Sequence, residues 1–202
     1  MINTREDAKH RKGDDMGIFF TSDPHFGHAN IIKYCNRPFA SVEEMDRTII
    51  DRWNERVGPD DTLYCLGDWC IWRGSKSIDE VAARYREQVK CGRIVMIWGN
   101  HDKKGRRNAN FQKLFDGVHD MLEVEIGDQL IVLCHYAMRV WNKSHHGSFH
   151  LYGHSHGSLS DELHSRSFDC GVDSFNFYPV SYDEVVEIMG RKSWQPVDHH
   201  GM

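Results

Sequence analysis

Five apolar runs in the sequence end in residues whose side chains bind metal ions. The chain leaves these runs through Asp-Pro-His, Gly-Asp, Gly-Asn-His-Asp, a single His and Gly-His-Ser-His. Carboxylate, imidazole and amide groups without thiolate are a ligand set that suits Mn²⁺, Fe, Zn or Ni. Ligands of α/β sheets lie at the carboxyl ends of the strands, so these segments are expected to converge in space. They occupy residues 23–25, 67–68, 99–102, 135 and 153–156.

No single one of these segments is specific. An Asp-x-His loop is usually a turn whose polar groups are satisfied locally, and Gly-Asp is common turn chemistry. His154 and His156 are a stronger signal, because side chains at i and i+2 point the same way where the backbone is extended. The five segments together, in this order, indicate a metal site far more strongly than any one of them.

The elements that must position these segments can be predicted for the first half of the chain. Strands are expected over residues 17–23, 62–68 and 93–100, each directly before one of the segments. Helices are expected between them, over residues 41–57 and 77–90. Each helix begins with Ser followed three residues later by Glu, and its apolar residues recur at helical spacing.

The second half is richer in strands. Three predicted strands are joined by short turns, with Gly127-Asp128 as a hairpin corner, and the last helix again opens with Ser and Glu three residues apart. Alternating strands and helices followed by a strand-rich half indicate an α/β fold that turns into α+β. The three predicted strands cover residues 121–126, 129–136 and 149–154, residues 166–172 are a candidate for one more, and the predicted helices cover 111–115 and 182–192.

The length and composition indicate one domain. A chain of 202 residues suits a single core, and residues 16–194 are expected to form it, with 1–15 a disordered leader and 195–202 a flexible tail. The net charge of −5 argues against a protein that coats nucleic acid. No apolar run reaches the length of a membrane span, and the N-terminus lacks the apolar core of a signal peptide, so a cytoplasmic location is expected.

In their order, the five segments resemble the motifs of the calcineurin-like metallophosphoesterases, which run DxH, GD, GNH(D/E), a lone H and GHxH. Here they read DPH, GD, GNHD, His135 and GHSH, with none missing. The longer string DPHFGHANIIKYCNRPF is similar to small bacterial and phage members without a cap domain. This resemblance implies an α/β (α+β) fold, a four-layer α-β-β-α sandwich of two mixed β-sheets flanked by helices.

The resemblance also implies two divalent metal ions that share one ligand. Mn²⁺ is favoured, with Fe, Zn or Ni as alternatives, and a hydroxide between the two ions would attack phosphorus. A carboxylate suits the shared position, because its two oxygens can each face a cation. One ion would take Asp23, His25, Asp68 and His156, and the other Asp68, Asn100, His135 and His154.

His101 is expected to be the general acid that protonates the leaving oxygen, so His101 and Asp68 are the catalytic residues that the resemblance implies. An imidazole suits this task because it titrates near neutral pH. Whether the adjacent Asp102 orients His101 is left open, since neighbouring side chains often point apart.

Four further residues are candidate substrate contacts: His28, Arg37, Arg139 and His146. His28 could equally cap the helix that begins near Asn30. Arg37 lies beside Pro38, where an arginine more often bridges carbonyl groups in a structural turn. Arg139 and His146 belong to a segment between two ligand histidines, and the sequence gives no basis for choosing among its residues.

The expected function is hydrolysis of a phosphate ester, more specifically a phosphodiester in a small or accessible substrate. Arg37 and Arg139 are the only arginines near the segments before or between ligands, and that shortage of cations favours a diester over a monoester dianion. The alternatives are a phosphomonoesterase, then a nuclease or nucleic-acid end-processing enzyme, then an inactive binding scaffold of the same fold. Nucleic acid is therefore expected only as a substrate, no membrane partner is expected, and the oligomeric state is not indicated.

Overall fold

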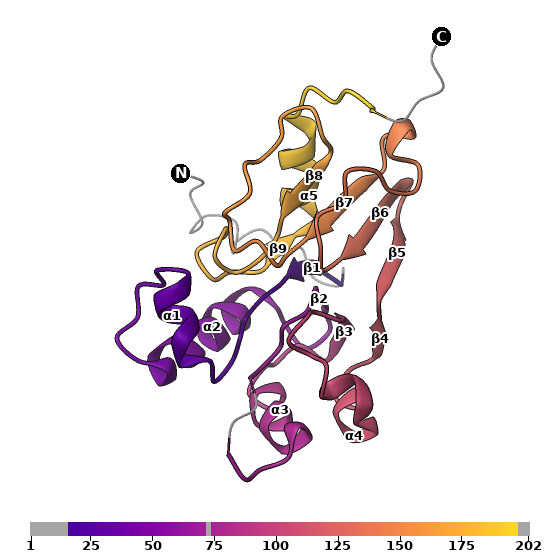
Figure 1. The fold of residues 1–202 in the computed structure, drawn as a ribbon. Helices are drawn as coiled ribbons and strands as arrows, with labels where there is room; N and C mark the ends of the chain where they lie inside the picture. Colours follow the sequence, from indigo (N-terminus) through magenta and orange to yellow (C-terminus); the bar gives the residue numbers. More distant parts are fainter. Residues whose placement is uncertain (1–15, 72–73, 198–202) are drawn as a thin grey trace.

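Two β-sheets lie face to face in the computed structural model, which describes residues 16–71 and 74–197 (Figure 1). The first sheet has the strand order β4-β3-β2-β1-β9. Strands β1 to β4 run parallel, and β9 pairs with β1 in the antiparallel direction. The strands are β1 (Ile18–Thr21), β2 (Thr62–Cys65), β3 (Arg93–Ile97), β4 (Gly117–His119) and β9 (Val180–Ser181).

The second sheet has the order β5-β6-β7-β8 and is also mixed. Its first two strands form an antiparallel hairpin in which Ile126 pairs with Gln129, as expected for a turn at Gly127-Asp128. Strands β6, β7 and β8 run parallel to one another. The strands are β5 (Met121–Ile126), β6 (Gln129–Cys134), β7 (Phe149–Tyr152) and β8 (Ser167–Asp169).

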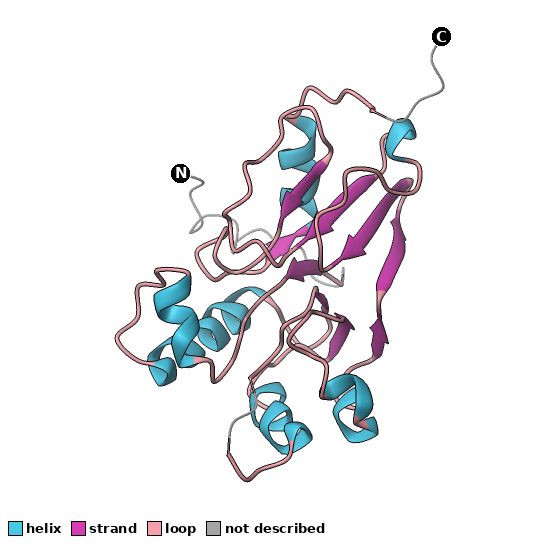
Figure 2. Ribbon diagram, viewed as in Figure 1, coloured by secondary structure: helices cyan, strands magenta, loops and turns pink. Residues whose placement is uncertain are grey.

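The helices start where the sequence places helix caps. The Ser41 Oγ accepts a hydrogen bond from the Glu44 N–H at 3.1 Å, and Ser77 and Ser181 each form a capping box with the Glu three residues on. Helices α1, α2, α3 and α4 lie on the side of the first sheet, and α5 is set apart from them (Figure 1 and Figure 2). The helices are α1 (Ala29–Tyr34), α2 (Val42–Arg56), α3 (Ile78–Arg86), α4 (Ala109–Gln112) and α5 (Tyr182–Gly190), with 3₁₀ turns η2 (Gly105–Arg107) and η3 (Ser144–His146).

Side-chain alternation along β1 divides the interior into two cores. Phe19 belongs to the core that the first sheet shares with α2, α3 and α4, whereas Phe20 belongs to the core between the two sheets. This follows from the strand period of two, which sends neighbouring residues to opposite faces. Ile131 and Leu151 contribute to the second core from β6 and β7, and Val185 contributes from α5. The first sheet is therefore buried on both faces, and its strand ends are held rigidly.

The predicted fold class is confirmed: two mixed sheets flanked by helices. Two strands were not predicted, β4 of three residues and β9 of two, because such short elements show no periodicity. The helix expected to reach residue 90 ends at Arg86. The expected leader, residues 1–15, lies outside the described residues, as do 198–202 of the expected tail. None of the helices in the described part of the chain has the length and apolar character needed to cross a membrane.

Candidate metal centre

The strand ends bring the five sequence segments together. Ile18 of β1 pairs with Thr62 of β2, which pairs with Arg93 of β3, so the three parallel strands end side by side. The Asp23 N–H then donates to the Gly67 carbonyl at 3.0 Å. The second sheet is tied in by the His154 N–H, which donates to the Asp23 Oδ2 at 2.8 Å. Both sheets therefore contribute side chains to one centre.

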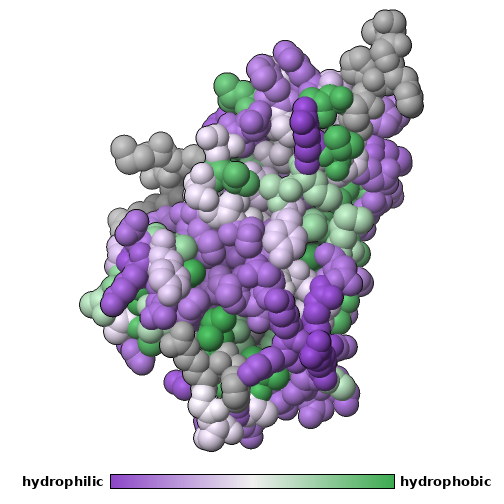
Figure 3. Space-filling view, in the orientation of Figure 1, coloured by the Kyte–Doolittle hydropathy of each residue, from purple (hydrophilic) through white to green (hydrophobic). Residues whose placement is uncertain are grey.

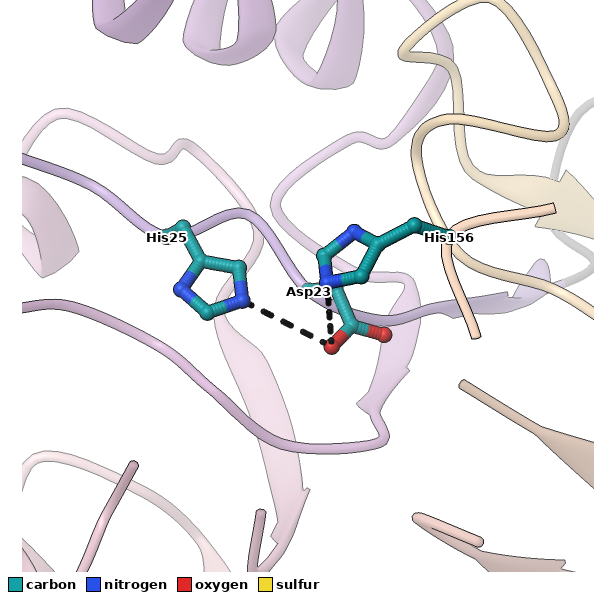
Figure 4. A group of neighbouring side chains, drawn as sticks. All are labelled: Asp23, His25 and His156. Atoms are coloured by element: carbon teal, nitrogen blue, oxygen red, sulfur yellow. Dashed lines mark ion pairs between the residues drawn. The ribbon is translucent and has the colours of Figure 1, made fainter. Parts of the chain in front are cut away.

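The first group of side chains is Asp23, His25 and His156 (Figure 4). The Asp23 Oδ1 lies 3.8 Å from the His25 Nε2 and 3.9 Å from the His156 Nε2. Asp23 and His25 are buried, and neither the Asp23 Oδ1 nor the His25 Nε2 has a hydrogen-bond partner among the described residues. Buried polar atoms without partners are rare and indicate a missing ligand or ion. These donor atoms fit a divalent cation.

The second group is Asp68, Asn100, His135 and His154. The His135 Nδ1 lies 2.7 Å from the Leu66 carbonyl, which can only accept, so this nitrogen carries the proton and the Nε2 of a neutral ring presents its lone pair. That Nε2 lies 2.9 Å from the Asn100 Oδ1, and the His154 Nδ1 lies 2.9 Å from the same oxygen. An imidazole nitrogen and an amide oxygen this close together are donor atoms that a divalent cation would bind.

Asp68 faces both groups. Its Oδ2 is 3.4 Å from the His25 Nε2 and 3.7 Å from the His135 Nε2. The Oδ1 accepts a hydrogen bond from the His101 N–H at 2.8 Å, which fixes the carboxylate plane. The position of Asp68 supports the shared ligand that the sequence predicts.

Burial disfavours charge on these side chains when no cation neutralises it. Burial raises the pKa of Asp23 to about 7; His156 opposes this shift, and the nearby Asp68 adds to it. Burial lowers the pKa of His25 well below its usual value, and the cationic form of His156 lowers it further. Burial also lowers the pKa of His135, although Asp68 opposes this. Bound cations need ionised carboxylates and neutral imidazoles, so metal affinity is expected to fall as these groups gain protons.

Backbone strain is concentrated at this centre. Five of the seven expected ligands have a left-handed backbone, with φ between 50° and 66°. Such conformations are uncommon for residues other than glycine and gather at functional sites. His154 and His156 are therefore not on extended backbone, as the i and i+2 argument assumed, although both rings reach the centre. The five strained residues are Asp23, His25, Asp68, His154 and His156.

Two glycines allow this close approach. A Cβ at Gly99 would collide with the Asp68 carboxylate, and a Cβ at Gly153 would collide with Ser22 and with the Asp23 carboxylate. Gly99 is therefore required because it leaves space for Asp68, and Gly153 because it leaves space for Asp23. This explains why glycine precedes Asn100 and His154.

Asp102 holds two ligand loops together, and none of the hydrogen bonds described for its carboxylate goes to the His101 ring. Its carboxylate accepts hydrogen bonds from the N–H groups of Asp68 at 2.7 Å, Gly99 at 2.8 Å and Trp69 at 3.2 Å. Burial raises the pKa of Asp102 to about 7, and the nearby Asp68 raises it further. The role left open by the sequence is therefore structural.

His156 is oriented by a residue that the sequence analysis missed. The Asp173 Oδ2 lies 2.7 Å from the His156 Nδ1, so the Nε2 is left to face Asp23. Burial lowers the pKa of His156, but the hydrogen bonds to Asp173 and Cys35 and the nearby carboxylates of Asp23 and Asp173 together outweigh burial and raise the pKa to about 10. A carboxylate behind a ligand histidine fixes its tautomer and orientation. Asp173 follows the end of β8, and that position is the signal that could have revealed it.

Arg37 was expected to contact substrate, but it is buried and does not line the cavity of the centre, so this expectation was wrong. The guanidinium is buried and holds Asp173 through two hydrogen bonds of 2.8 Å. It also donates to the Asp23 carbonyl at 2.8 Å and to the Pro24 carbonyl at 3.1 Å. Arg37 therefore braces the loop of the first ligands, which is the structural-turn alternative.

His101 lines a cavity of about 530 Å³ at the centre. His28 is not among the described lining residues; its Nδ1 lies 3.4 Å from the His25 Nδ1, and its side chain makes no cap hydrogen bond to α1. Arg139 and His146 are exposed and are not among the lining residues, so the structure does not bring them to the centre. The lining comprises Ile31, Tyr34, Cys35, Asn36, Asp68, Asn100, His101, His154, Ser155, His156 and Ser158.

Known proteins are similar to this chain in sequence and in fold. Residues 16–168 match the family model of the calcineurin-like phosphoesterase superfamily domain. An uncharacterised protein of Methanocaldococcus jannaschii is 35% identical over 179 residues, which is 86% of this chain and 92% of that protein. The Gene 66 protein of Mycobacterium phage L5 is 28% identical over 199 residues, covering 86% of this chain and 94% of that protein.

One solved structure has a similar fold over most of both chains. It is a protein of unknown function from Aquifex aeolicus, with a TM-score of 0.64 and 21% identity. The match covers 86% of this chain and 100% of that one. At this identity the likeness concerns the fold alone.

The position of Asp68 leads to the first prediction. Asp68→Asn is expected to lower metal content at both positions and to abolish essentially all turnover, because an amide cannot offer an anionic oxygen to each of two cations. Metal content is measured by elemental analysis of the purified protein, with Asp128→Asn at the β5–β6 turn as a matched surface control. Two retained equivalents of metal with persistent turnover would show that Asp68 is not shared.

Asp173 leads to the second prediction. Asp173→Asn is expected to weaken the metal held by His156 about 10–100-fold, the usual effect of losing a carboxylate behind a ligand histidine. The metal held by His135 keeps its affinity, because that ring is oriented by the Leu66 carbonyl. Metal titrations of this variant and of Asp183→Asn, on the surface of α5, measure the difference. Equal affinity loss at both positions would contradict the assignment.

Proposed function

Because the chain belongs to the calcineurin-like phosphoesterase superfamily and is a metal-dependent phosphoester hydrolase, we propose that it cleaves phosphodiesters, with His101 as the general acid. Two divalent cations, Mn²⁺ being the favoured metal, would activate water and neutralise the phosphate oxygens. Asp23, His25, Asp68 and His156 would hold one, and Asp68, Asn100, His135 and His154 the other. The orphaned atoms of Asp23 and His25 support this assignment.

The position of His101 supports its role as the acid. Its backbone N–H is fixed by the Asp68 Oδ1 at 2.8 Å, while its exposed ring lines the cavity of the centre. The ring lies 5.2 Å from that of His25 and 6.2 Å from that of His28, measured between centroids. The ring therefore lies beside the ligands with its nitrogens free to reach a leaving oxygen. Its protonated form would donate to that oxygen as the ester bond breaks.

The observation that carries the diester assignment is the lining of the cavity. Its described lining residues include neither lysine nor arginine. A monoester dianion benefits from cationic side chains around its extra charge, whereas a diester carries one negative charge. Arg37 is buried behind Asp173, and Arg139 lines a different cavity. A phosphomonoesterase remains the second candidate, since both ester classes need the same ligands.

The third prediction separates the acid from the ligands. His101→Asn is expected to keep metal content near that of the wild type while lowering turnover about 10²–10⁴-fold, the usual contribution of general acid catalysis. The loss shrinks for esters of good leaving groups, because these need little protonation. Steady-state kinetics over a series of aryl and alkyl leaving groups measure this.

His146→Asn is the matched control, since His146 is exposed and does not line the cavity. It is expected to keep wild-type turnover. An equal loss across all leaving groups in His101→Asn would show that His101 binds substrate without donating a proton.

The fourth prediction concerns the substrate class. With Mn²⁺, bis-p-nitrophenyl phosphate is expected to be hydrolysed with a higher kcat/KM than p-nitrophenyl phosphate, because the cavity offers no arginine or lysine to a dianion. Kinetics on both compounds at matched metal concentration measure the ratio. A preference for the monoester would overturn the diester assignment and make the protein a phosphatase.

A further inference from the structure

A second cavity, of about 500 Å³, lies beside the outer face of the second sheet. Its lining residues come from three segments, within 137–144, 159–167 and 194–197, together with Tyr152, and Leu163 is not among them. This cavity shares no lining residue with the metal cavity. Its volume is within the range of small-molecule sites, and its residues have no part in the proposed reaction.

Aromatic rings form much of its wall. Trp141 and Tyr152 are buried, and the Trp141 Nε1 donates to the Ser148 Oγ at 3.0 Å, which fixes the indole. Trp194 closes the wall from the C-terminal segment, with the Arg166 guanidinium 4.8 Å from its ring centroid. Fixed aromatic faces favour a flat ring as the occupant, because stacking then costs little side-chain entropy.

The charge of the wall is positive. Arg139 and Arg166 line the cavity against one carboxylate, that of Glu162. In the part of the chain that the structure describes, neither arginine forms an ion pair. The Arg166 Nε is buried without an acceptor, although its Nη1 donates to the Gly147 carbonyl at 3.3 Å. A guanidinium with unused donors is suited to an anionic oxygen.

Buried polar side chains hold the walls in place. The Lys192 Nζ donates to the Ser167 carbonyl at 2.7 Å and to the Glu162 carbonyl at 3.3 Å, which ties residues 162–167 to the C-terminal segment. On the other side, the Met138 N–H donates to the His150 Nε2 at 3.1 Å. His150 is in turn fixed by the Val132 carbonyl, 2.9 Å from its Nδ1. The cavity is therefore largely preformed.

The mouth of the cavity carries exposed apolar side chains. Leu159 and Val197 line it and are 52% and 64% exposed, which is unusual for residues of this size. Figure 3 shows hydrophobic side chains next to hydrophilic ones over the half of the molecule that contains the second sheet. This combination of apolar rim, aromatic wall and guanidinium groups would match a ligand that is itself part apolar and part charged.

We propose that this second cavity binds a small ligand that joins a flat aromatic ring to an anionic group, a class that nucleoside monophosphates represent. The ring would stack on the tryptophans and the anion would take the unused donors of Arg139 and Arg166. The cavity adjoins the metal centre along one loop, in which Ser158 lines the metal cavity and Leu159 lines the second.

The test uses 8-anilinonaphthalene-1-sulfonate, a fluorescent aromatic anion that is not a phosphate ester. It is titrated into the metal-loaded protein, with saturating inorganic phosphate present to occupy the metal centre. One binding site is expected. Its affinity falls about tenfold or more in Trp194→Ala and in Arg139→Gln, as for the loss of a stacking surface or a charged hydrogen bond. AMP displaces the probe at lower concentration than adenosine or ribose 5-phosphate.

Matched controls lie outside the cavity. Leu163→Ala is on the same loop and Arg191→Gln is on the surface after α5, and both keep wild-type affinity. Thermal melts verify that each variant is folded. The proposal is overturned by absent binding, by unchanged affinity in both cavity variants, or by equal competition from AMP and either adenosine or ribose 5-phosphate. Because binding is read without turnover, these outcomes are independent of the phosphodiesterase proposal.

Discussion

The structure depends on one costly constraint: buried polar atoms of the expected ligands converge at one centre, and two of them have no hydrogen-bond partner among the described residues. The Asp23 Oδ1 and His25 Nε2 have no partner among the described residues, and the His135 Nε2 faces the Asn100 Oδ1 at 2.9 Å. Each unsatisfied buried group costs about 1–3 kcal/mol. A rigid framework must hold these atoms together until cations offset that cost. The doubly buried first sheet, with strand ends fixed by two cores, provides this framework.

The same constraint explains what the surrounding charges do. The carboxylate of Asp102 holds the loops of Asp68 and Gly99, and Asp173 orients His156 while Arg37 neutralises it. These charged groups are engaged in positioning ligands and are not free to meet a substrate. The described lining of the metal cavity consequently offers the Asp68 carboxylate together with imidazole, amide, hydroxyl and thiol groups, and no lysine or arginine. Its charge selectivity would then depend on the cations themselves, which is the ground for proposing a singly charged ester as the substrate.

The fold class was predictable from the sequence, because strand and helix patterns are local features. The seven expected ligands stay a prediction, made from residue types at strand ends and from the order of the motifs. The positioning role of Arg37 was not predictable, because its partner Asp173 is 136 residues away and only the folded chain shows the pair. The left-handed backbone of His154 and His156 was also hidden, since nothing in their residue types requires it. Strands β4 and β9 exist only through pairing with β3 and β1, so no local pattern marks them.

The two cavities attract anions by different physics. In the metal cavity, cations held by carboxylates and imidazoles would bind hard oxygen atoms whatever the rest of the ligand is. In the second cavity, guanidinium groups lie beside aromatic faces. An anion would therefore bind there with higher affinity if it also carries a ring that stacks on these faces. A chain with a net charge of −5 repels anions in general, and therefore needs such local concentrations of positive charge. Separate placement lets one small fold hold a reactive phosphate and a flat aromatic anion without competition between them.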